Sequence, residues 1–142
     1  MTTTQIRIRG YHEDRFGHVN NARYLELLEE ARWAHLEERG LTASFLDEQG
    51  VFPVIVRLSV SYRRPASAGD LLEIETNVLR SGRRKVVLKQ VGRFVGSDEI
   101  CVEAEMTAIF IDLESGRAVA LGDAFRDAWP ELADSDRDVA RA

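Results

Sequence analysis

Between Ala22 and about Arg39 the apolar positions repeat with the period of an α-helix. Asn20 or Asn21 is a good N-cap for this helix. Trp33 falls on the side opposite the main apolar face, which indicates either a subunit contact or a sheet that wraps far around the helix. The pattern predicts one long amphipathic helix whose buried face consists of Tyr24, Leu27, Leu28, Ala31 and His35, widened by Leu25 and Leu36.

From residue 54 onward the period changes to two, as in strands with one buried face. Two short helices are also indicated, Thr42 to Gln49 and Asp123 to about Leu132, the second interrupted by Pro130. The turns between successive strands are too short for crossover helices, so the sheet should be antiparallel. The predicted strands are Gln5 to Arg9, Val54 to Arg63, Leu72 to Ser81, Val86 to Phe94, Ile100 to Phe110 and Ala118 to Leu121.

These elements predict a fold of the α+β class, in which a long central helix fills the inner face of a curved antiparallel sheet of five or six strands. The 142 residues and their 44% hydrophobic content suit one core, so we expect residues 1–142 to form a single domain. Residues 133–142 are polar enough to form a loose tail.

The net charge of −5 argues against binding to nucleic acid, because a phosphate backbone requires a basic face. Cys101 is the only cysteine, so no intrachain disulfide can form, and we expect it on the outer face of its strand. The first residues lack the charged and apolar pattern of a signal peptide, and no stretch is long enough to span a bilayer. We therefore expect a cytoplasmic protein without a membrane partner.

The stretch from His12 to Tyr24 concentrates polar chemistry where a simple connector would need only a turn. The backbone N–H groups just beyond the helix N-cap have no partner inside the helix, and the helix dipole adds positive charge there. Asp14 lies a few residues upstream, and Gly17 permits the tight backbone that folds its carboxylate towards the helix end. A carboxylate beside donors for an oxyanion fits acyl transfer.

These residues resemble the 4-hydroxybenzoyl-CoA thioesterase class of hotdog-fold proteins, and within it the FadM-type long-chain acyl-CoA thioesterases. The similarity covers about residues 5 to 121. Arg15 departs from the small residue that many relatives have after the aspartate, which affects the shape of the pocket entrance. The motif that carries the resemblance is Asp14-x-x-Gly17-His18-Val19-Asn20-Asn21-Ala22-x-Tyr24, followed by Leu25 and by Glu29-Glu30-Ala31-Arg32.

The resemblance implies an acyl-CoA thioesterase that releases a fatty or aromatic acid and coenzyme A. Asp14 would be the catalytic carboxylate, and the backbone amide near Asn21 would polarise the thioester carbonyl. Asp14 can act as a nucleophile or as a general base, and the sequence leaves both open. His18 is a candidate for a direct role, although the chain has no serine elbow with which it would pair. Glu29 and Glu30 are reserve carboxylates on the helix.

A coenzyme A ester needs cations for its phosphates and an apolar channel for its acyl tail. The channel would be lined by Leu25, Leu28 and residues of the long strand. The expected substrate-binding residues are Gly17, Val19, Asn20 and Tyr24 of the motif, with Arg63 and Arg64 in one basic cluster and Arg83, Arg84 and Lys85 in another.

The three histidines lack the spacing of metal ligands, so we predict no metal, and the reaction implies no cofactor. The resemblance further implies a homodimer that assembles into a homotetramer, with the pocket between subunits. An alternative function is a non-catalytic acyl-CoA binding or regulatory module on the same scaffold, which would not need Asp14. A hydratase or dehydratase shares the fold but should carry a differently placed histidine.

Overall fold

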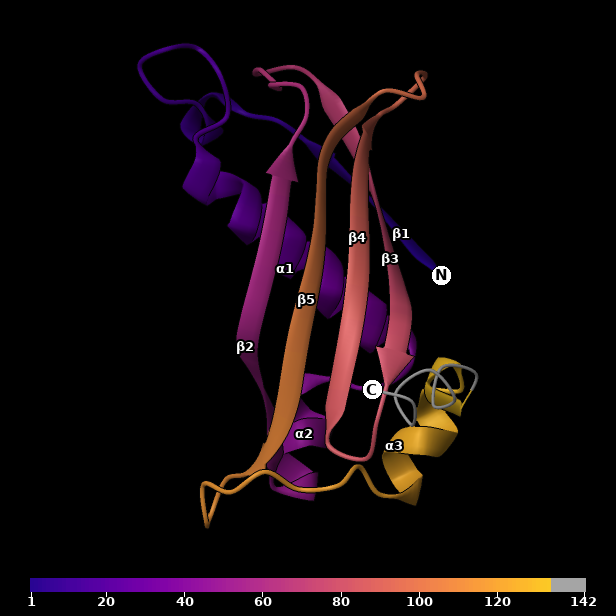
Figure 1. The fold of residues 1–142 in the computed structure, drawn as a ribbon. Helices are drawn as coiled ribbons and strands as arrows, with labels where there is room; N and C mark the ends of the chain where they lie inside the picture. Colours follow the sequence, from indigo (N-terminus) through magenta and orange to yellow (C-terminus); the bar gives the residue numbers. More distant parts are fainter. Residues whose placement is uncertain (134–142) are drawn as a thin grey trace.

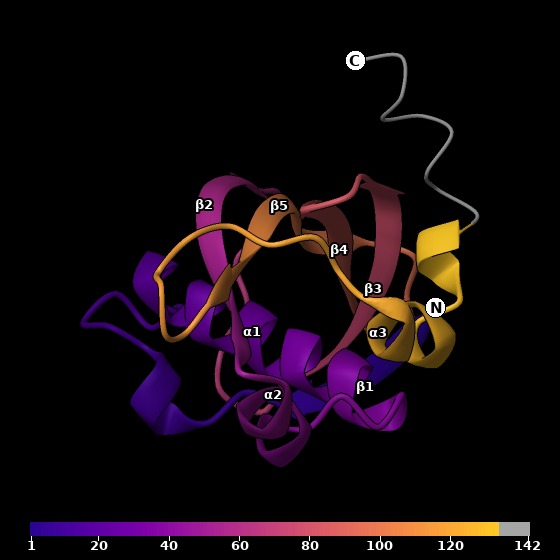
Figure 2. The ribbon, with the colours of Figure 1, turned by 90° about the horizontal axis from the view of Figure 1, so that it is seen from below.

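The computed structural model describes residues 1–133 of the chain, and in it the long helix α1, Asn21–Glu38, lies against the concave face of one antiparallel sheet (Figure 1). Seen from below, the sheet curves around α1 (Figure 2). The strand order is β1-β3-β4-β5-β2, so β1 and β2 form the two edges. The five strands are β1 Thr2–Arg7, β2 Val51–Tyr62, β3 Leu71–Ser81, β4 Lys85–Phe94 and β5 Ile100–Asp112.

The helix ends follow from local chemistry. Asn20 caps α1, because its side chain accepts a hydrogen bond from the Ala22 N–H. Thr42 caps the short helix α2, Ala43–Gln49, in the same way through the Phe45 N–H. Gly50 follows α2 in the left-handed conformation, with φ of 67°, which costs glycine little. A 3₁₀ turn, η1 Gly10–His12, leads from β1 towards the motif loop.

Two apolar clusters fill the space between α1 and the sheet. The first lies around the N-terminal half of α1 and includes Tyr24, Leu28, Ile74 and Val102. The second lies around its C-terminal half and includes the helix α3, Asp123–Ala128. Burial of these apolar side chains is the main force that holds the helix in the curve of the sheet. The second cluster is built by Leu36, Leu41, Leu46, Leu88, Met106, Phe110, Phe125 and Trp129.

The predicted class, helix and antiparallel sheet are confirmed, but several element boundaries differ. The first strand is Thr2–Arg7 and not Gln5 to Arg9, because Thr2 pairs with Thr76 at the edge of the sheet. The long strand begins at Val51, before Pro53, which is tolerated because β2 is an edge strand. The predicted strand Ala118 to Leu121 is wrong, since only Ala118 forms an isolated bridge to Ile111. The sheet therefore has five strands in the described residues.

β-Bulges changed the direction of individual side chains. A register shift between Ile55 and Arg57 leaves Val56 54% exposed, although the alternating pattern had placed it on the same face as Val54. The expectation that Cys101 lies on the outer face is also wrong. The pairing of β4 with β5 skips Cys101, and the thiol is fully buried in the first cluster. Such bulges depend on the partner strand and have no clear local signature.

The C-terminal end matches the sequence in part. Helix α3 ends at Ala128, shortly before Pro130, so the interruption there is confirmed. The tail predicted for residues 133–142 falls almost entirely outside the described residues. Of the helices in residues 1–133, none combines the length and the apolar character needed to cross a membrane.

Candidate active site

The motif loop folds back on itself before α1 begins. The Asp14 N–H donates to the His18 carbonyl oxygen at 3.0 Å, and the Gly17 N–H donates to the Asp14 carbonyl oxygen at 3.1 Å. Gly17 has φ of 78°, a conformation that side chains other than glycine rarely adopt. Glu13 and Val19 form an isolated bridge across the loop. Asp14 is thereby brought back beside the start of α1, as the sequence predicts.

Asp14 is half-buried, and two donors hold its carboxylate. Its Oδ1 accepts a hydrogen bond from the Phe16 N–H at 2.9 Å, and its Oδ2 lies 3.5 Å from the amide nitrogen of the Asn20 side chain. The carboxylate faces a cavity of about 310 Å³. The lining of this cavity, called the loop cavity below, consists of Asp14, Val19, Asn21, Tyr24, Tyr62, Arg63, Arg64 and Pro65.

Among the described residues, the first turn of α1 leaves one backbone donor without an acceptor, and it belongs to a residue that lines the loop cavity. The Asn20 side chain accepts from the Ala22 N–H, and the Asn20 carbonyl accepts from the N–H groups of Arg23 and Tyr24. For the Asn21 N–H, the structure gives no acceptor within residues 1–133. An N–H at this position points out of the helix end, where the dipole is positive. The loop cavity thus combines a carboxylate with a donor suited to an oxyanion.

Two tyrosines form the inner wall of the loop cavity. The Tyr62 hydroxyl donates to the Asn21 carbonyl oxygen at 3.0 Å, and the two rings lie 5.4 Å apart. The Tyr24 hydroxyl accepts from the Ala66 N–H at 3.0 Å, and burial raises the pKa of this phenol. Tyr24 therefore stays protonated and structural. Sequence reasoning did not name Tyr62 and Pro65 as site residues, although the run Tyr62-Arg63-Arg64-Pro65-Ala66 belongs to the resemblance to the FadM-type thioesterases.

The two predicted basic clusters lie far apart. Arg63 and Arg64 border the loop cavity, but Arg63 pairs with Glu103 at 3.1 Å and Arg64 pairs with Glu99. Arg64 also lies over the Phe94 ring, 5.0 Å from its centroid. The other cluster, Arg83, Arg84 and Lys85, is exposed at the turn between β3 and β4, at the opposite end of the sheet (Figure 1). One subunit does not bring the two clusters together.

The remaining candidates lie around the site rather than in it. His18 and Gly17 are exposed in the loop, and neither residue lines the loop cavity. Glu29 and Glu30 are exposed on α1, further along the helix. Within residues 1–133, no cluster of histidine, cysteine or carboxylate side chains has the geometry of a metal site.

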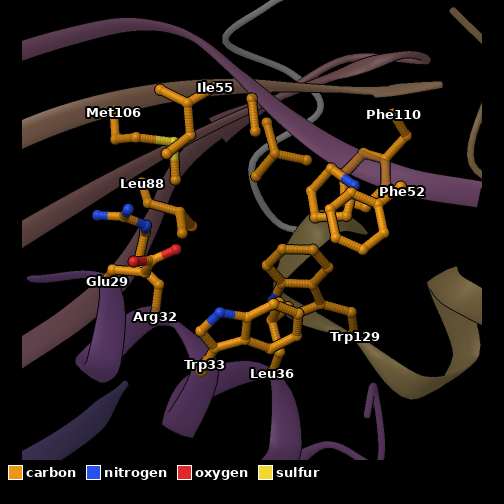
Figure 3. Close-up of a pocket in the computed structure, with 13 residues that line it drawn as sticks. Glu29, Arg32, Trp33, Leu36, Phe52, Ile55, Leu88, Met106, Phe110 and Trp129 are labelled. Atoms are coloured by element: carbon orange, nitrogen blue, oxygen red, sulfur yellow. The ribbon is translucent and has the colours of Figure 1, made fainter. Parts of the chain in front are cut away.

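A second cavity lies between the C-terminal half of α1 and the sheet (Figure 3). It has a volume of about 140 Å³, and its walls are mostly apolar. Trp33 lines it together with Phe52 and Ile55 of β2, so the sheet that wraps around α1 explains this tryptophan. We call it the tryptophan cavity, because Trp129 forms another of its walls.

Residues 10–129 match the family described as the thioesterase-like superfamily. The long-chain acyl-CoA thioesterase FadM of Escherichia coli (strain K12) is 39% identical over 129 residues, which are 91% of this chain and 97% of FadM. The acyl-CoA thioester hydrolase YbgC of Shigella flexneri is 31% identical over 117 residues, covering 79% of this chain and 86% of YbgC.

Among solved structures, that of YbaW, a probable thioesterase from Escherichia coli, superposes with a TM-score of 0.82. It is 36% identical, and the match covers 93% of this chain and 98% of YbaW. The resemblance found in the sequence is confirmed: this chain has the hotdog fold and belongs to the thioesterase-like superfamily.

Proposed function

We propose that the protein is an acyl-CoA thioesterase whose reaction takes place in the loop cavity. The observation that carries this proposal is that Asp14 and Asn21 line the same cavity at the N-terminus of α1, where the Asn21 N–H has no acceptor within residues 1–133. The names of the relatives support the same reaction, since both FadM and YbgC hydrolyse acyl-CoA thioesters by their descriptions.

In the proposed reaction the thioester carbonyl oxygen accepts a hydrogen bond from the Asn21 N–H. This donor and the helix dipole stabilise the negative charge that develops on that oxygen. Asp14 takes a proton from water, the water oxygen attacks the carbonyl carbon, and the carbon–sulfur bond breaks. The proton passes to the leaving thiolate, so the products are the free acid and coenzyme A. The contacts from Phe16 and Asn20 hold the carboxylate in place.

Asp14 can instead attack the carbonyl carbon itself and form a mixed anhydride, which water then hydrolyses. Hydroxylamine distinguishes the two routes, because it converts an anhydride at Asp14 into a hydroxamate that mass spectrometry detects. A modified Asp14 peptide after turnover supports the nucleophile. Turnover without any modification supports the general base.

For the acyl group we propose a long aliphatic chain, in line with the description of FadM. Leu25 lies one helical turn after Asn21 on the same side of α1 and is 37% exposed, so it can cover a tail that leaves the loop cavity. Leu28, the other helix residue expected in the channel, is completely buried in the core. Leu25→Trp should shift the preferred substrate towards shorter chains.

The phosphates of coenzyme A would bind Arg63 and Arg64, which border the loop cavity and can exchange their glutamate partners for phosphate. Arg64→Gln should therefore raise KM for acyl-CoA while leaving kcat nearly unchanged. Arg84→Gln is the matched variant at the distant turn. An equal rise in KM would show that the distant cluster takes part, as it would if a partner subunit supplied it.

We also propose the homodimer and homotetramer that the resemblance implies. β2 is an edge strand, so one row of its backbone groups has no partner in the sheet, and Ile55 within this strand is 46% exposed. Val56→Lys places a charge on this edge and should reduce the mass measured by light scattering to that of a monomer. An unchanged mass would place the subunit interface elsewhere.

The decisive test is thiol release from acyl-CoA substrates of increasing chain length. Asp14→Asn should lower kcat by at least about 100-fold, while the melting temperature stays unchanged. Asp98→Asn, which changes an exposed carboxylate in the β4–β5 turn, should retain full activity. Absence of thiol release from any acyl-CoA, with binding preserved, would favour a binding module. Hydration of an enoyl-CoA would favour a hydratase.

A further inference from the structure

The tryptophan cavity contains one buried charge in an apolar surrounding (Figure 3). Arg32 extends from α1 into the space below the sheet and is only 9% exposed. The only other charged residue in the lining is Glu29, which is exposed on α1. The aromatic and aliphatic walls include Trp33, Phe52, Ile55, Met106, Phe110 and Trp129.

Most donors of the Arg32 guanidinium have no partner in the described residues. Its Nη1 donates to the Gln90 side-chain oxygen at 3.1 Å, and this is the single hydrogen bond that the structure gives to it within residues 1–133. Gln90 is itself fixed, since its amide nitrogen donates to the Leu28 carbonyl at 2.9 Å and to the Thr76 hydroxyl at 3.0 Å. A guanidinium carries five N–H donors. Four of them therefore remain available.

These donors are not sealed in the core. Among the described residues, the Thr4 hydroxyl is the one completely buried side-chain polar atom without a partner. The nitrogens of Arg32 that lack a partner are therefore not completely buried, and Arg32 lines the tryptophan cavity. Within residues 1–133, no ion pair joins Glu29 to Arg32.

The electrostatics favour an additional anion. Burial lowers the pKa of Arg32, which means that the surroundings stabilise its charge poorly, and the charge of Glu29 offsets only part of this effect. Arginine stays protonated even when buried, so it needs an acceptor rather than a change of charge. A carboxylate is the acceptor that matches the planar fork of a guanidinium. The apolar walls in turn favour a hydrocarbon body beside that carboxylate.

We propose that the tryptophan cavity binds a small apolar carboxylic acid, with the carboxylate on Arg32 and the hydrocarbon part between the two tryptophans. The volume of about 140 Å³ is close to that of a cavity known to hold a benzene ring, so the buried part is a ring or a chain of roughly six carbons. The proposal does not rest on thioester hydrolysis, since binding is measured without substrate. Free acids released by hydrolysis belong to the same chemical class.

The chain carries its own probe for this site. Trp33 and Trp129 are its two tryptophans, and both line the cavity, so intrinsic fluorescence reports on its occupant. The full-length protein is titrated with hexanoate and phenylacetate, and with their neutral counterparts hexanamide and phenylacetamide. We expect at least one acid to change the tryptophan fluorescence in a saturable way. Its Kd should be at least about tenfold lower than that of its amide, the difference that a charge-assisted hydrogen bond makes. The better acid shows whether an aliphatic or an aromatic body fits.

Two variants test the role of the charges. Arg32→Met replaces the charged guanidinium by an apolar side chain that still fills part of the space. It should abolish the preference for acid over amide. Glu29→Gln removes the negative charge at the rim and should tighten binding of the acid by roughly twofold to fivefold. Glu30→Gln, an exposed neighbour outside the lining, should have no effect.

Equal binding of acid and amide to the natural protein would overturn the proposal. It would also be overturned if none of the four compounds changed the tryptophan fluorescence. An acid preference that survives in Arg32→Met would also overturn it. If Arg32→Met fails to fold, as judged by circular dichroism, Glu29→Gln decides. Tighter binding of the acid in that variant supports the site, and unchanged binding excludes it.

Discussion

The two ends of α1 treat their polar groups in opposite ways. At the N-terminal end, the Asn21 N–H has no acceptor in the described residues and Asp14 is half open to solvent. At the C-terminal end, His35 is completely buried and both of its ring nitrogens are bonded. Its Nε2 accepts from the Trp129 indole at 3.0 Å, which leaves Nδ1 protonated to donate to the Thr2 hydroxyl at 2.8 Å.

Arg39 extends this closed network. Its Nη1 donates at 2.8 Å both to the Thr2 hydroxyl and to the His35 carbonyl, and its Nε donates to Glu131 at 3.0 Å. The network joins the first strand, the long helix and the segment after α3. The difference between the ends teaches that the closed end holds the fold together, whereas the open end keeps donors and acceptors available for a ligand.

The largest expected effect compares one residue type in both regions. Phe125 is buried in the second cluster with its ring 5.4 Å from Phe45 and 5.8 Å from Phe110, whereas Phe16 is 75% exposed in the motif loop. Phe125→Ala should lower the free energy of unfolding by about 3–5 kcal/mol. Phe16→Ala should change it by less than about 0.5 kcal/mol. Urea denaturation measures both, and comparable losses would contradict the division between the ends.

Acid should weaken the closed end. Burial, with a smaller contribution from Arg39, lowers the pKa of His35 to about 4, below the ordinary value of 6.5 expected in the unfolded chain. Between these values the unfolded chain binds a proton that the folded protein excludes. The free energy of unfolding should therefore fall as the pH drops from about 6.5 to about 4, by about 3 kcal/mol in total.

Denaturation series at several pH values test this contribution. His35→Gln should be less stable at pH 7 and should lose most of the dependence on pH in that window. His18→Gln, which changes an exposed imidazole in the motif loop, should keep the natural slope. A slope that persists in His35→Gln would assign the acid sensitivity to other groups.

The caps of two helices separate stability from activity. Asn20→Ala removes the cap of α1 and should cost about 1 kcal/mol of unfolding free energy. It also removes the amide nitrogen beside Asp14, so kcat for acyl-CoA should fall as well. Thr42→Ala removes the cap of α2 at a similar cost, but we expect no loss of kcat. Parallel losses of activity in both variants would mean that stability alone explains them.

The smallest effect concerns the tyrosine that closes the loop cavity. Tyr62→Phe removes the hydrogen bond to the Asn21 carbonyl and should cost about 0.5–1 kcal/mol of stability, because this bond is partly exposed to solvent. We expect kcat to fall only a few-fold, since the Asn21 N–H is kept. Tyr11→Phe, in the exposed 3₁₀ turn, serves as the matched control and should change neither quantity.

Much of this molecule could be predicted from local pattern. The period of 3.6 and the polar residue at Asn20 predicted α1 and its cap, and the motif around Asp14 predicted where a carboxylate meets a helix end. These features depend on neighbours within one or two turns of the chain. The predicted strand at Ala118 was wrong, because local alternation does not show whether a segment has a partner strand to pair with.

The sequence by itself determined the helix, the order of the strands along the chain and the position of Asp14 before the helix N-terminus. The tertiary structure decided which distant residues share a cavity. It brought Tyr62 to Asn21, turned Cys101 into the core at a bulge, separated Arg83 from Arg63 by the length of the sheet and placed Arg32 in the same cavity as Trp129. The physical reason is that periodicity is encoded by near neighbours, whereas strand register, bulges and cavities arise only when strands distant in sequence pair around one helix.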